Sequence, residues 1–383
     1  MSPHHDALDV AVPVEQQPGL GSGVQRLRMA DGSLAWLVGG YNDCRRWLRS
    51  GLLALDDVHA GSGYRGFRLP GSLAADLQNR DGEDHARLRA LAAQPLAPRH
   101  VARWEGHIGR VADQLAASLV LRGGGELMGD FALPLVLTVV CDLLDIPVAD
   151  RRDLAGWTRT MFRPDRSGGL DSAVEHVRRL MARLVADRRR TPGDDLITWW
   201  GTTGSEHARA DEDELVLLAF GMWWAGIENT AHLICLSALH LIRQPGTLRD
   251  HPRQAPAVVE ELLRRHGPAL TSARRFARRD VTIGGRHIPA GDTVLFALAA
   301  ANHDPDQFPH PYRFLPDRPS GHHLAFGHGP HYCPGAALAR AELRATLGAL
   351  HHLPRLALAV PENALNWRRS PRLKGLLTLP VTV

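Results

Sequence analysis

The chain has 383 residues, of which 44% are hydrophobic, so it can bury a large core. Its formal net charge of +4 arises from 45 basic and 41 acidic residues that are evenly scattered, which argues against a nucleic-acid partner. The four cysteines lack the spacing of a disulfide scaffold or a zinc ribbon. The N-terminus lacks a secretory signal pattern, and the longest apolar run, residues 215–227, is shorter than the roughly 20 residues of a membrane span. We therefore expect a soluble, cytoplasmic protein with no membrane partner.

The pattern along the chain predicts a mainly α-helical fold with small β-sheets. Glycine- and proline-rich stretches are short and dispersed, so residues 1–383 are expected to form a single domain. Helical periodicity dominates from about residue 84 to residue 265. Strand patterns are few, and they are predicted at residues 281–283, 294–296 and 376–381.

Two pairs of polar residues have helical spacing. His85 and Arg89 are four residues apart, and Glu261 and Arg264 are three apart, so each pair lies on one helix face. Either pair, taken alone, is a common surface feature. Between them, Cys141 lies in an apolar segment over residues 131–144 and is predicted to be a core residue.

The longest predicted helix covers residues 211–242. Acidic residues at its start suit the positive end of the helix dipole, and Pro245 and Gly246 end it, giving about 33 residues or roughly 50 Å. In its middle, Glu228 lies in a strongly apolar segment, where a buried carboxylate costs free energy unless a partner or a function accounts for it. This part of the helix is therefore a candidate site.

Three residues share the helix face of this acid, because they are spaced three or four residues apart. The face consists of Gly221, Trp224, Ala225 and Glu228. Gly226 leaves space beside the backbone, and the small Ala225 would let a flat group approach. Trp223 is expected in the core. Trp224 is either another core residue or the wall of a substrate pocket, where it would favour aromatic or peptide-like ligands by stacking.

Residues 326–335 read Phe-Gly-His-Gly-Pro-His-Tyr-Cys-Pro-Gly and place Cys333 in a loop. Glycines on both sides let the backbone approach a ligand atom closely. A helix-forming run follows, so Cys333 lies just before a helix N-terminus, where free N–H groups and the helix dipole favour a thiolate. Such a thiolate is either a nucleophile or a metal ligand.

This stretch resembles the cysteine loop of the cytochrome P450 family, the haem-thiolate monooxygenases, whose pattern Phe-Gly-x-Gly-x-His-x-Cys-x-Gly it matches at every fixed position. The resemblance extends from about residue 80 to the end of the chain. It implies haem b (iron protoporphyrin IX) as the cofactor and Cys333 as the axial iron ligand, whose electron donation favours cleavage of the O–O bond. The other haem-binding residues that it implies are His85, Arg89, Arg275 and His331 at the propionates, Phe326 and Gly335 in the cysteine loop, and Ala225 and Gly226 on the oxygen side.

The resemblance also assigns a supporting network and a proton relay. Glu261 and Arg264, completed by Arg313, would support the cysteine loop.

The family usually has an acid followed by threonine on the long helix, and this pair organises water for proton delivery. Glu228 keeps the acid, but Asn229 replaces the threonine. Asn229 either positions a water, leaves the substrate to supply a hydroxyl, or belongs to a less controlled relay that suits radical coupling.

The predicted function is a haem-thiolate oxidase that activates O2 and oxidises a small or peptide-like molecule in secondary metabolism. Three alternatives remain open: oxidative aryl coupling or ring formation, a peroxide-driven haem enzyme, and a non-catalytic haem-binding sensor or carrier. Selectivity is expected from residues 58–75, from the turn at 373–374, and from a pocket that includes Leu270 and Thr271. The chain lacks a convincing dinucleotide fingerprint, so a ferredoxin or flavodoxin-like donor is implied. We expect a monomer, with Arg99, Arg103 and Arg340 as donor contacts.

Overall fold

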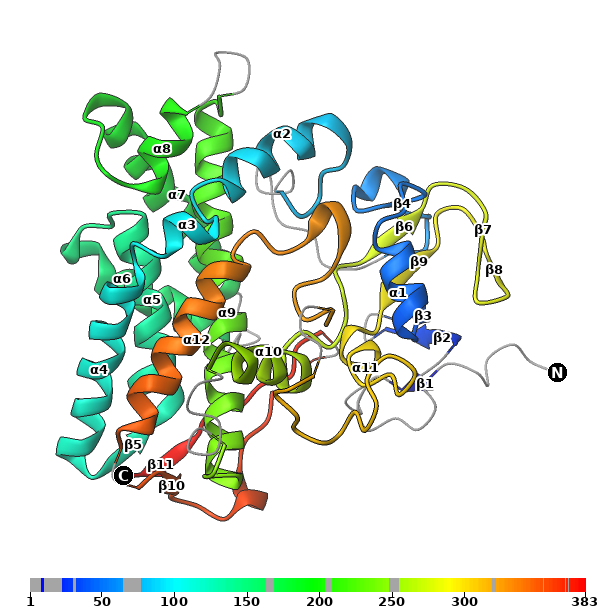
Figure 1. Cartoon of the computed structure of the whole chain (residues 1–383). Helices are drawn as coiled ribbons and strands as arrows, with labels where there is room; N and C mark the ends of the chain where they lie inside the picture. Colours follow the sequence, from blue (N-terminus) through cyan, green and yellow to red (C-terminus); the bar gives the residue numbers. More distant parts are fainter. Residues whose placement is uncertain are drawn as a thin grey trace.

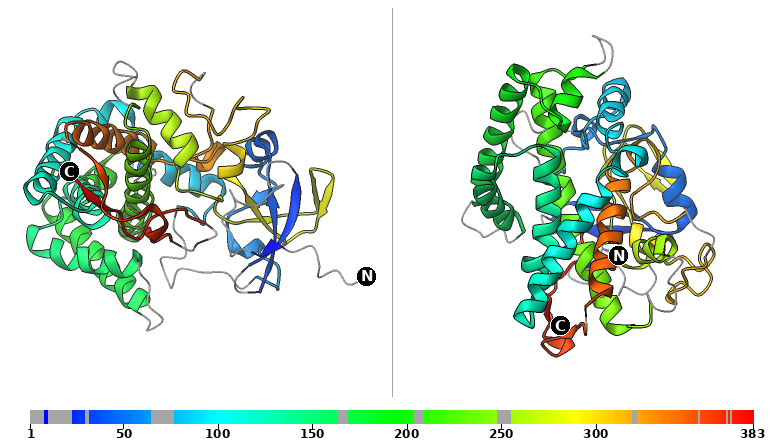
Figure 2. Two further views of the ribbon diagram at one scale, coloured as in Figure 1. Left: turned by 90° about the horizontal axis from the view of Figure 1, so that it is seen from below. Right: turned by 60° about the vertical axis from the view of Figure 1, so that its left-hand side comes forward.

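The computed structural model describes residues 8–9, 23–29, 32–64, 77–162, 169–203, 209–247, 255–318, 322–353, 355–368, 370 and 372–383. Helices dominate this part of the chain, which confirms the predicted mainly α class. Figure 1 shows the long helices gathered on one side of the molecule and the largest sheet on the other, and the left view of Figure 2 shows the same division. Among the described residues, no helix combines the length and apolar character that crossing a bilayer requires.

The helices of the described residues are α1 (Tyr41–Trp47), α2 (Gly82–Ala93), α3 (Pro98–Val101), α4 (Glu105–Arg122), α5 (Leu133–Leu143), α6 (Val148–Phe162), α7 (Gly169–Arg190), α8 (Leu196–Thr202), α9 (Glu212–Arg243), α10 (Ala255–His266), α11 (Leu298–Ala301) and α12 (Ala336–His351). Helix α9 is the centre of the helical part, because α5, α7 and α12 all pack against it. Its apolar residues belong to one large core that also includes Cys141, which is 1% exposed, as predicted.

Helix α9 begins and ends close to the predicted bounds. Asp211 is its N-cap, and the side chain of Asp211 accepts from the amide of Glu214 (2.8 Å) while the Glu214 carboxylate accepts from the amide of Asp211 (3.1 Å). This capping box satisfies two of the amides that a helix start leaves without partners. From this cap, α9 continues for 32 residues.

The strands are short. The main sheet has the order β1-β2-β3-β9-β6-β4, formed by β1 (Leu8–Asp9), β2 (Val24–Arg28), β3 (Leu34–Val38), β9 (Thr293–Phe296), β6 (Arg275–Ala277) and β4 (Leu53–Ala54). A three-stranded sheet has the order β10-β11-β5, from β10 (Ala357–Leu358), β11 (Pro380–Thr382) and β5 (Gly124–Glu126), and β7 (Val281–Ile283) pairs with β8 (Arg286–Ile288).

The predicted strands at 281–283 and 294–296 are confirmed by β7 and β9. The prediction at residues 376–381 is wrong in its bounds, because β11 starts only at Pro380 and Leu376 forms an isolated bridge with Trp367. Strands β2 and β3, which pair antiparallel through five residues each, were not predicted. They precede the region of strong periodicity, and β3 is defined by its parallel partner β9, some 250 residues later in the chain.

Candidate active site

The cysteine loop is closed by its own main chain. The amide of Cys333 donates to the carbonyl of Phe326 (2.9 Å), and Gly335 is the N-cap of α12. Gly329 has a φ of 80°, and a Cβ added there would lie 3.0 Å from the Leu48 carbonyl oxygen, so this position requires glycine. The loop therefore presents Cys333 at a helix N-terminus, as the sequence predicted.

The surroundings of Cys333 act on the pKa of its thiol in two opposite directions. Burial raises the pKa of the thiol, and the amide of Gly335 with the charges of Arg89 and Arg340 only partly offsets this. The helix start thus favours a thiolate, but its effect does not outweigh burial in the protein alone. A bound metal cation would supply further positive charge, because a coordinating thiol loses its proton on binding. The environment fits a metal ligand better than a free nucleophile.

Helix α2 brings two predicted residues to this loop. His85, which is 4% exposed, stacks on His331 with ring centroids 3.8 Å apart, and Arg89 donates to the carbonyl of Tyr332. His331 Nε2 lies 3.3 Å from Asp81 Oδ1. Burial, followed by the charges of His331 and Arg89, lowers the pKa of His85 to about 4, so its ring is neutral at pH 7. The fold thus unites residues that are far apart in the sequence.

Arg275, at the start of β6, is suited to bind an anionic group. The residue is 4% exposed, and its Nε has no hydrogen-bond partner among the described residues. Burial lowers its pKa to about 10, and the charge of Asp81 partly offsets this. A buried guanidinium with an unused donor costs free energy unless a carboxylate arrives to pair with it. A haem propionate is such a group, so the residues present fit haem.

The middle of α9 carries a half-exposed stripe inside an otherwise buried helix. Its members are Gly221, Met222, Trp224, Ala225, Gly226, Glu228 and Asn229. A Cβ added at Gly221 would meet nothing within 4 Å, which marks open space beside the helix. Trp224 lies on this stripe and stacks on Phe220 (5.9 Å between centroids), whereas Trp223 is fully buried and donates to Thr158 Oγ1 (2.8 Å). The tandem tryptophans therefore separate into a fully buried core residue and a partly exposed one that packs against the core.

Glu228 is held by the C-terminal segment. Its carboxylate forms an ion pair with Arg368, and its side chain is 14% exposed. His232 Nε2 lies 3.9 Å from the same carboxylate, but burial, followed by the charge of Arg368, lowers the pKa of His232 to about 4, so the ring is neutral at pH 7. Burial raises the pKa of Glu228, and the charges of Arg368 and Arg372 partly offset this. The carboxyl group can therefore hold a proton more readily than an exposed glutamate.

The reach of Arg368 depends on close packing one helical turn beyond Glu228. The amide of Arg368 donates to the carbonyl of Gly375 (2.9 Å), and a Cβ added at Gly375 would lie 2.2 Å from His232 Nδ1. Only a glycine lets the C-terminal backbone come this close to the helix. In Figures 1 and 2 this red segment runs beside α9.

The residues after Glu228 point in different directions. Asn229 lies on the half-exposed stripe, and its amide group donates to the carbonyl of Ala225 at 3.4 Å. Thr230 is 7% exposed, and its hydroxyl donates to the carbonyl of Gly226 (3.1 Å). Thr230 is therefore turned into the core, and the amide of Asn229 takes the place where a hydroxyl was expected.

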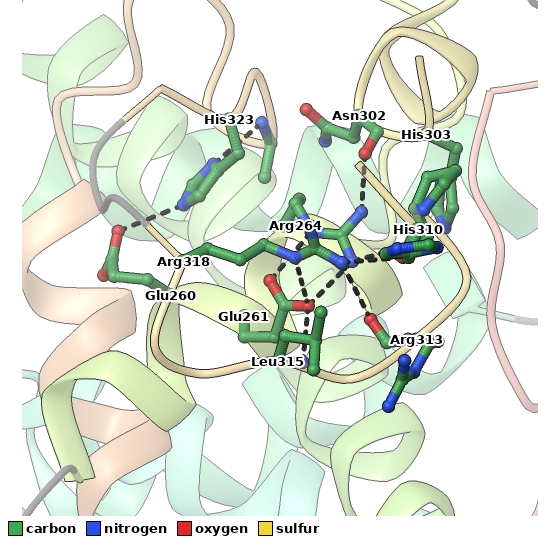
Figure 3. A network of polar contacts seen from close by, with 12 residues as sticks. Glu260, Glu261, Arg264, Asn302, His303, His310, Arg313, Leu315, Arg318 and His323 are labelled. Atoms are coloured by element: carbon green, nitrogen blue, oxygen red, sulfur yellow. Dashed lines mark hydrogen bonds and ion pairs between the residues drawn. The ribbon is translucent and has the colours of Figure 1, made fainter. Parts of the chain in front are cut away.

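The network that supports the cysteine loop contains a different arginine from the one predicted. Arg264 binds the Glu261 carboxylate through two 2.8 Å hydrogen bonds, and the second arginine is Arg318, whose Nε donates to Glu261 at 3.1 Å. Arg313 is exposed and contributes only its carbonyl, which accepts from Arg318 (3.2 Å); Figure 3 shows its side chain pointing away. The prediction of Arg313 is wrong because the chain turns at residues 309–318 and brings the later arginine back.

The predicted pocket loops are only partly described. Leu270 is 1% exposed and Thr271 is 6% exposed, which does not match a position lining open space. The contribution of Leu270 is its amide, which donates to the carbonyl of Arg372 (2.9 Å) and fixes the C-terminal turn. Of the predicted selectivity segment 58–75, residues 65–75 lie outside the described residues.

The three arginines expected to contact an electron donor have different environments. Arg99 and Arg103 are exposed. Arg340 is already engaged, because its guanidinium binds Glu260 (2.6 and 2.9 Å) and lies 4.7 Å above the Phe326 ring. Glu260 also accepts from His323 (3.1 Å). Arg340 therefore orders the cysteine loop from within, a role that the sequence did not indicate.

Comparison with known proteins agrees with this site. The family model of cytochrome P450 matches residues 255–366. The chain is 34% identical over 368 residues to the cytochrome P450 monooxygenase PikC of Streptomyces venezuelae, covering 93% of this chain and 87% of PikC. It is 32% identical to the polyketide biosynthesis cytochrome P450 PksS of Bacillus subtilis, covering 91% and 89%, and the PksS structure aligns with a TM-score of 0.87. A structure of the mixed-function P450 MycG aligns with a TM-score of 0.88 at 32% identity, covering 98% of both chains.

The cysteine loop before α12 and the interior acid of α9 agree with these relatives. The chain belongs to the cytochrome P450 family, and it is a monooxygenase by class.

Proposed function

We propose that haem b lies between the half-exposed stripe of α9 and the cysteine loop, in one domain that includes all 383 residues. Cys333 would bind the iron, and His85, Arg89, Arg275 and His331 would hold the propionates. The observation that carries this proposal is the buried Nε of Arg275, which is without a partner among the described residues and needs an anionic group. When bound, the haem supplies the chemistry of O2 activation.

The residues on the oxygen side would manage protons. Glu228 holds or releases a proton at its carboxylate, and Arg368 sets how readily it does so, because the ion pair favours the charged form. Asn229 can donate to and accept from one water through its amide, but it cannot pass a proton along as a hydroxyl does. The relay would therefore run through a water that Asn229 positions, or through a hydroxyl of the substrate.

The substrate is proposed to be a small organic or peptide-like molecule of secondary metabolism, oxidised by hydroxylation or epoxidation. The names of PikC and PksS as a monooxygenase and a polyketide biosynthesis P450 support this class. Oxidative coupling or ring formation is the second candidate. It is favoured by the amide of Asn229 on the stripe, because a reaction that tolerates a less controlled relay does not need the hydroxyl.

Electrons are proposed to come from a ferredoxin or flavodoxin-like partner that docks on the cysteine side of a monomeric, cytoplasmic protein. The exposed Arg99 and Arg103 in and beside α3 support this, because cations on that face suit an acidic partner. Arg340 would act by supporting the loop from inside.

Two measurements test the function. The reduced protein under carbon monoxide should show the absorption band of thiolate-ligated haem, and Cys333→Ser should lose it; an unchanged spectrum in the variant would overturn the ligand assignment. Product formation with ferredoxin, ferredoxin reductase and NADPH, compared with H2O2 alone, separates the monooxygenase from a peroxide-driven enzyme. Absence of turnover in both, over a broad substrate panel, would favour a haem carrier.

A further inference from the structure

Two consecutive glutamates of α10 belong to different networks. Glu261 binds Arg264 and Arg318, and its side chain is 4% exposed. Glu260, whose side chain is 22% exposed, binds the guanidinium of Arg340 on α12 through hydrogen bonds of 2.6 and 2.9 Å. Helices α10 and α12 pack against each other, and Figure 3 shows the Glu260 carboxylate beside the Glu261 network. The Glu260–Arg340 pair is therefore a partly shielded ion pair that joins the two helices.

Arg340 contacts the residues that adjoin the cysteine on both sides of its loop. The guanidinium lies 4.7 Å from the centroid of the Phe326 ring, and its Nη1 lies 3.3 Å from the hydroxyl of Tyr332. The carbonyl of Phe326 accepts from the amide of Cys333 (2.9 Å), and Tyr332 directly precedes Cys333 in the chain. The permanent positive charge of Arg340 therefore rests on the immediate neighbours of Cys333.

The position of this charge is fixed by the fold. Tyr332 is held at both ends, because its carbonyl accepts from Arg89 of α2 while its hydroxyl contacts Arg340 of α12. Arg340 also donates to the carbonyl of Ala336 in the first turn of its own helix (3.3 Å). The rings of Phe326 and Tyr332 meet edge to face, with their centroids 6.2 Å apart. Movement of the guanidinium would therefore disturb the loop itself.

The counter-charge is fixed as well. His323 Nε2 lies 3.1 Å from Glu260 Oε2, and His323 Nδ1 accepts from the amide of Ala325 (3.3 Å). Because Nδ1 accepts, the ring hydrogen lies on Nε2 and is donated to the carboxylate. The His323 side chain is 6% exposed, so this hydrogen bond is shielded from water. The carboxylate of Glu260 is thus oriented by His323 as well as by Arg340.

A fixed pair of opposite charges beside an iron ligand acts on the iron's affinity for an electron. Reduction of haem iron adds one negative charge at the centre, so a nearby cation favours the reduced state and a nearby carboxylate favours the oxidised state. Solvent screens partly buried charges less than exposed ones. Charges and hydrogen bonds around the axial ligand are among the protein's means of setting a haem potential. Removal of either partner of the pair would leave the other charge uncompensated.

We propose that the Glu260–Arg340 pair adjusts the reduction potential of the haem, with Arg340 as a positioning residue that acts through Phe326 and Tyr332. This inference rests on the proposed function, because it assumes that Cys333 binds the haem iron. Arg340 favours the ferrous state, and Glu260 opposes it. The balance between them sets how strongly reducing an electron donor must be to reduce this enzyme.

The test measures the reduction potential of the haem-loaded enzyme by spectroelectrochemical titration at one pH and one salt concentration. Arg340→Gln should lower the equilibrium constant for reduction about tenfold and Glu260→Gln should raise it about tenfold, each a shift of about 59 mV for one electron. Arg340→Lys keeps the charge but loses the planar contacts, so its constant should stay within about threefold of the wild type.

The matched control is Arg344→Gln, which removes the same charge one turn farther along α12. Arg344 pairs with Glu105, and the two side chains are 34% and 49% exposed, so this change should alter the constant by less than about twofold. Shifts of Arg340→Gln and Glu260→Gln in the same direction would overturn the inference, because a purely structural pair disturbs the site alike whichever partner is lost. Shifts no larger than that of the control, or opposite in sign to those expected, would also overturn it.

Two further comparisons keep the test decisive. If Arg340→Gln does not retain haem, a raised constant in Glu260→Gln together with a nearly unchanged one in Arg340→Lys supports the inference, and any other combination overturns it. The carbon monoxide spectrum of the wild type separates these outcomes from failure of the proposed function. A wild type without the band of thiolate-ligated haem refutes the proposed function, whereas a normal band with unresponsive potentials refutes only the role of the Glu260–Arg340 pair.

Discussion

Replacing Arg318 by leucine should destabilise the protein far more than the same change at Arg313. Arg318 is 11% exposed in its side chain and donates to Glu261 (3.1 Å), to the His310 carbonyl (2.7 Å), to the Arg313 carbonyl (3.2 Å) and to the Pro309 carbonyl. Glu261 keeps Arg264 and the amide of Leu315 as partners, so the variant does not leave it bare. The cost is therefore about 3 kcal/mol, near the lower limit for breaking a buried charged pair.

This free energy converts into a measurable shift of the melting temperature. The entropy of unfolding is about 2.1 cal/mol/K per residue, which for a chain of this length gives about 0.8 kcal/mol/K. Arg318→Leu should therefore melt about 4 °C lower in thermal unfolding followed by circular dichroism, and it should retain less haem. Arg313→Leu, at an exposed position, should melt within about 1 °C of the wild type. Equal shifts in the two variants would refute the network as described.

Asn229→Thr should increase the fraction of NADPH electrons that appear in product if proton delivery limits the reaction; equal or poorer coupling would assign a dedicated role to the amide. Gly375→Ala should cost about 1 to 3 kcal/mol in chemical denaturation, because its Cβ would lie 2.2 Å from His232 Nδ1. Gly348→Ala, where the Cβ meets nothing within 4 Å, should be neutral or stabilising, and a similar loss in both would contradict the packing argument. Stability should also fall as pH drops from 6.5 toward 4. The pKa values of His85, His232 and His240 are each lowered to about 4, mainly by burial, so the unfolded chain binds protons first. Each contributes at most about 1.4 kcal/mol per pH unit, and a free energy of unfolding that is flat between pH 6.5 and 5 would disprove this.

Features that depend on neighbours in the sequence were predictable. The capping residues and the Pro-Gly stop defined α9 to within one residue, and the pairing of Glu261 with Arg264 follows from three-residue spacing on a helix. The cysteine loop was equally clear, because its glycines and the following helix are adjacent to Cys333. For the tandem tryptophans, the sequence predicted that Trp223 lies in the core but left the environment of Trp224 open. Helical periodicity places the two side chains on different faces, but it does not show which other segments pack against each face.

Contacts between distant segments needed the tertiary structure. Arg318 joins Glu261 across 57 residues, and Arg368 reaches Glu228 only because Gly375 lets the C-terminal backbone pack on His232. Asp81, which lies between the cysteine loop and Arg275, had no local pattern to mark it.

The sequence by itself therefore determined the family, the cysteine loop and the long helix, because these depend on short-range hydrogen bonding and spacing. The tertiary structure decided which charges meet, and with them the raised pKa of the Cys333 thiol and the pairing of Glu228 with Arg368. The physical reason is that burial and electrostatic fields depend on every segment that surrounds a group, whatever its distance along the chain.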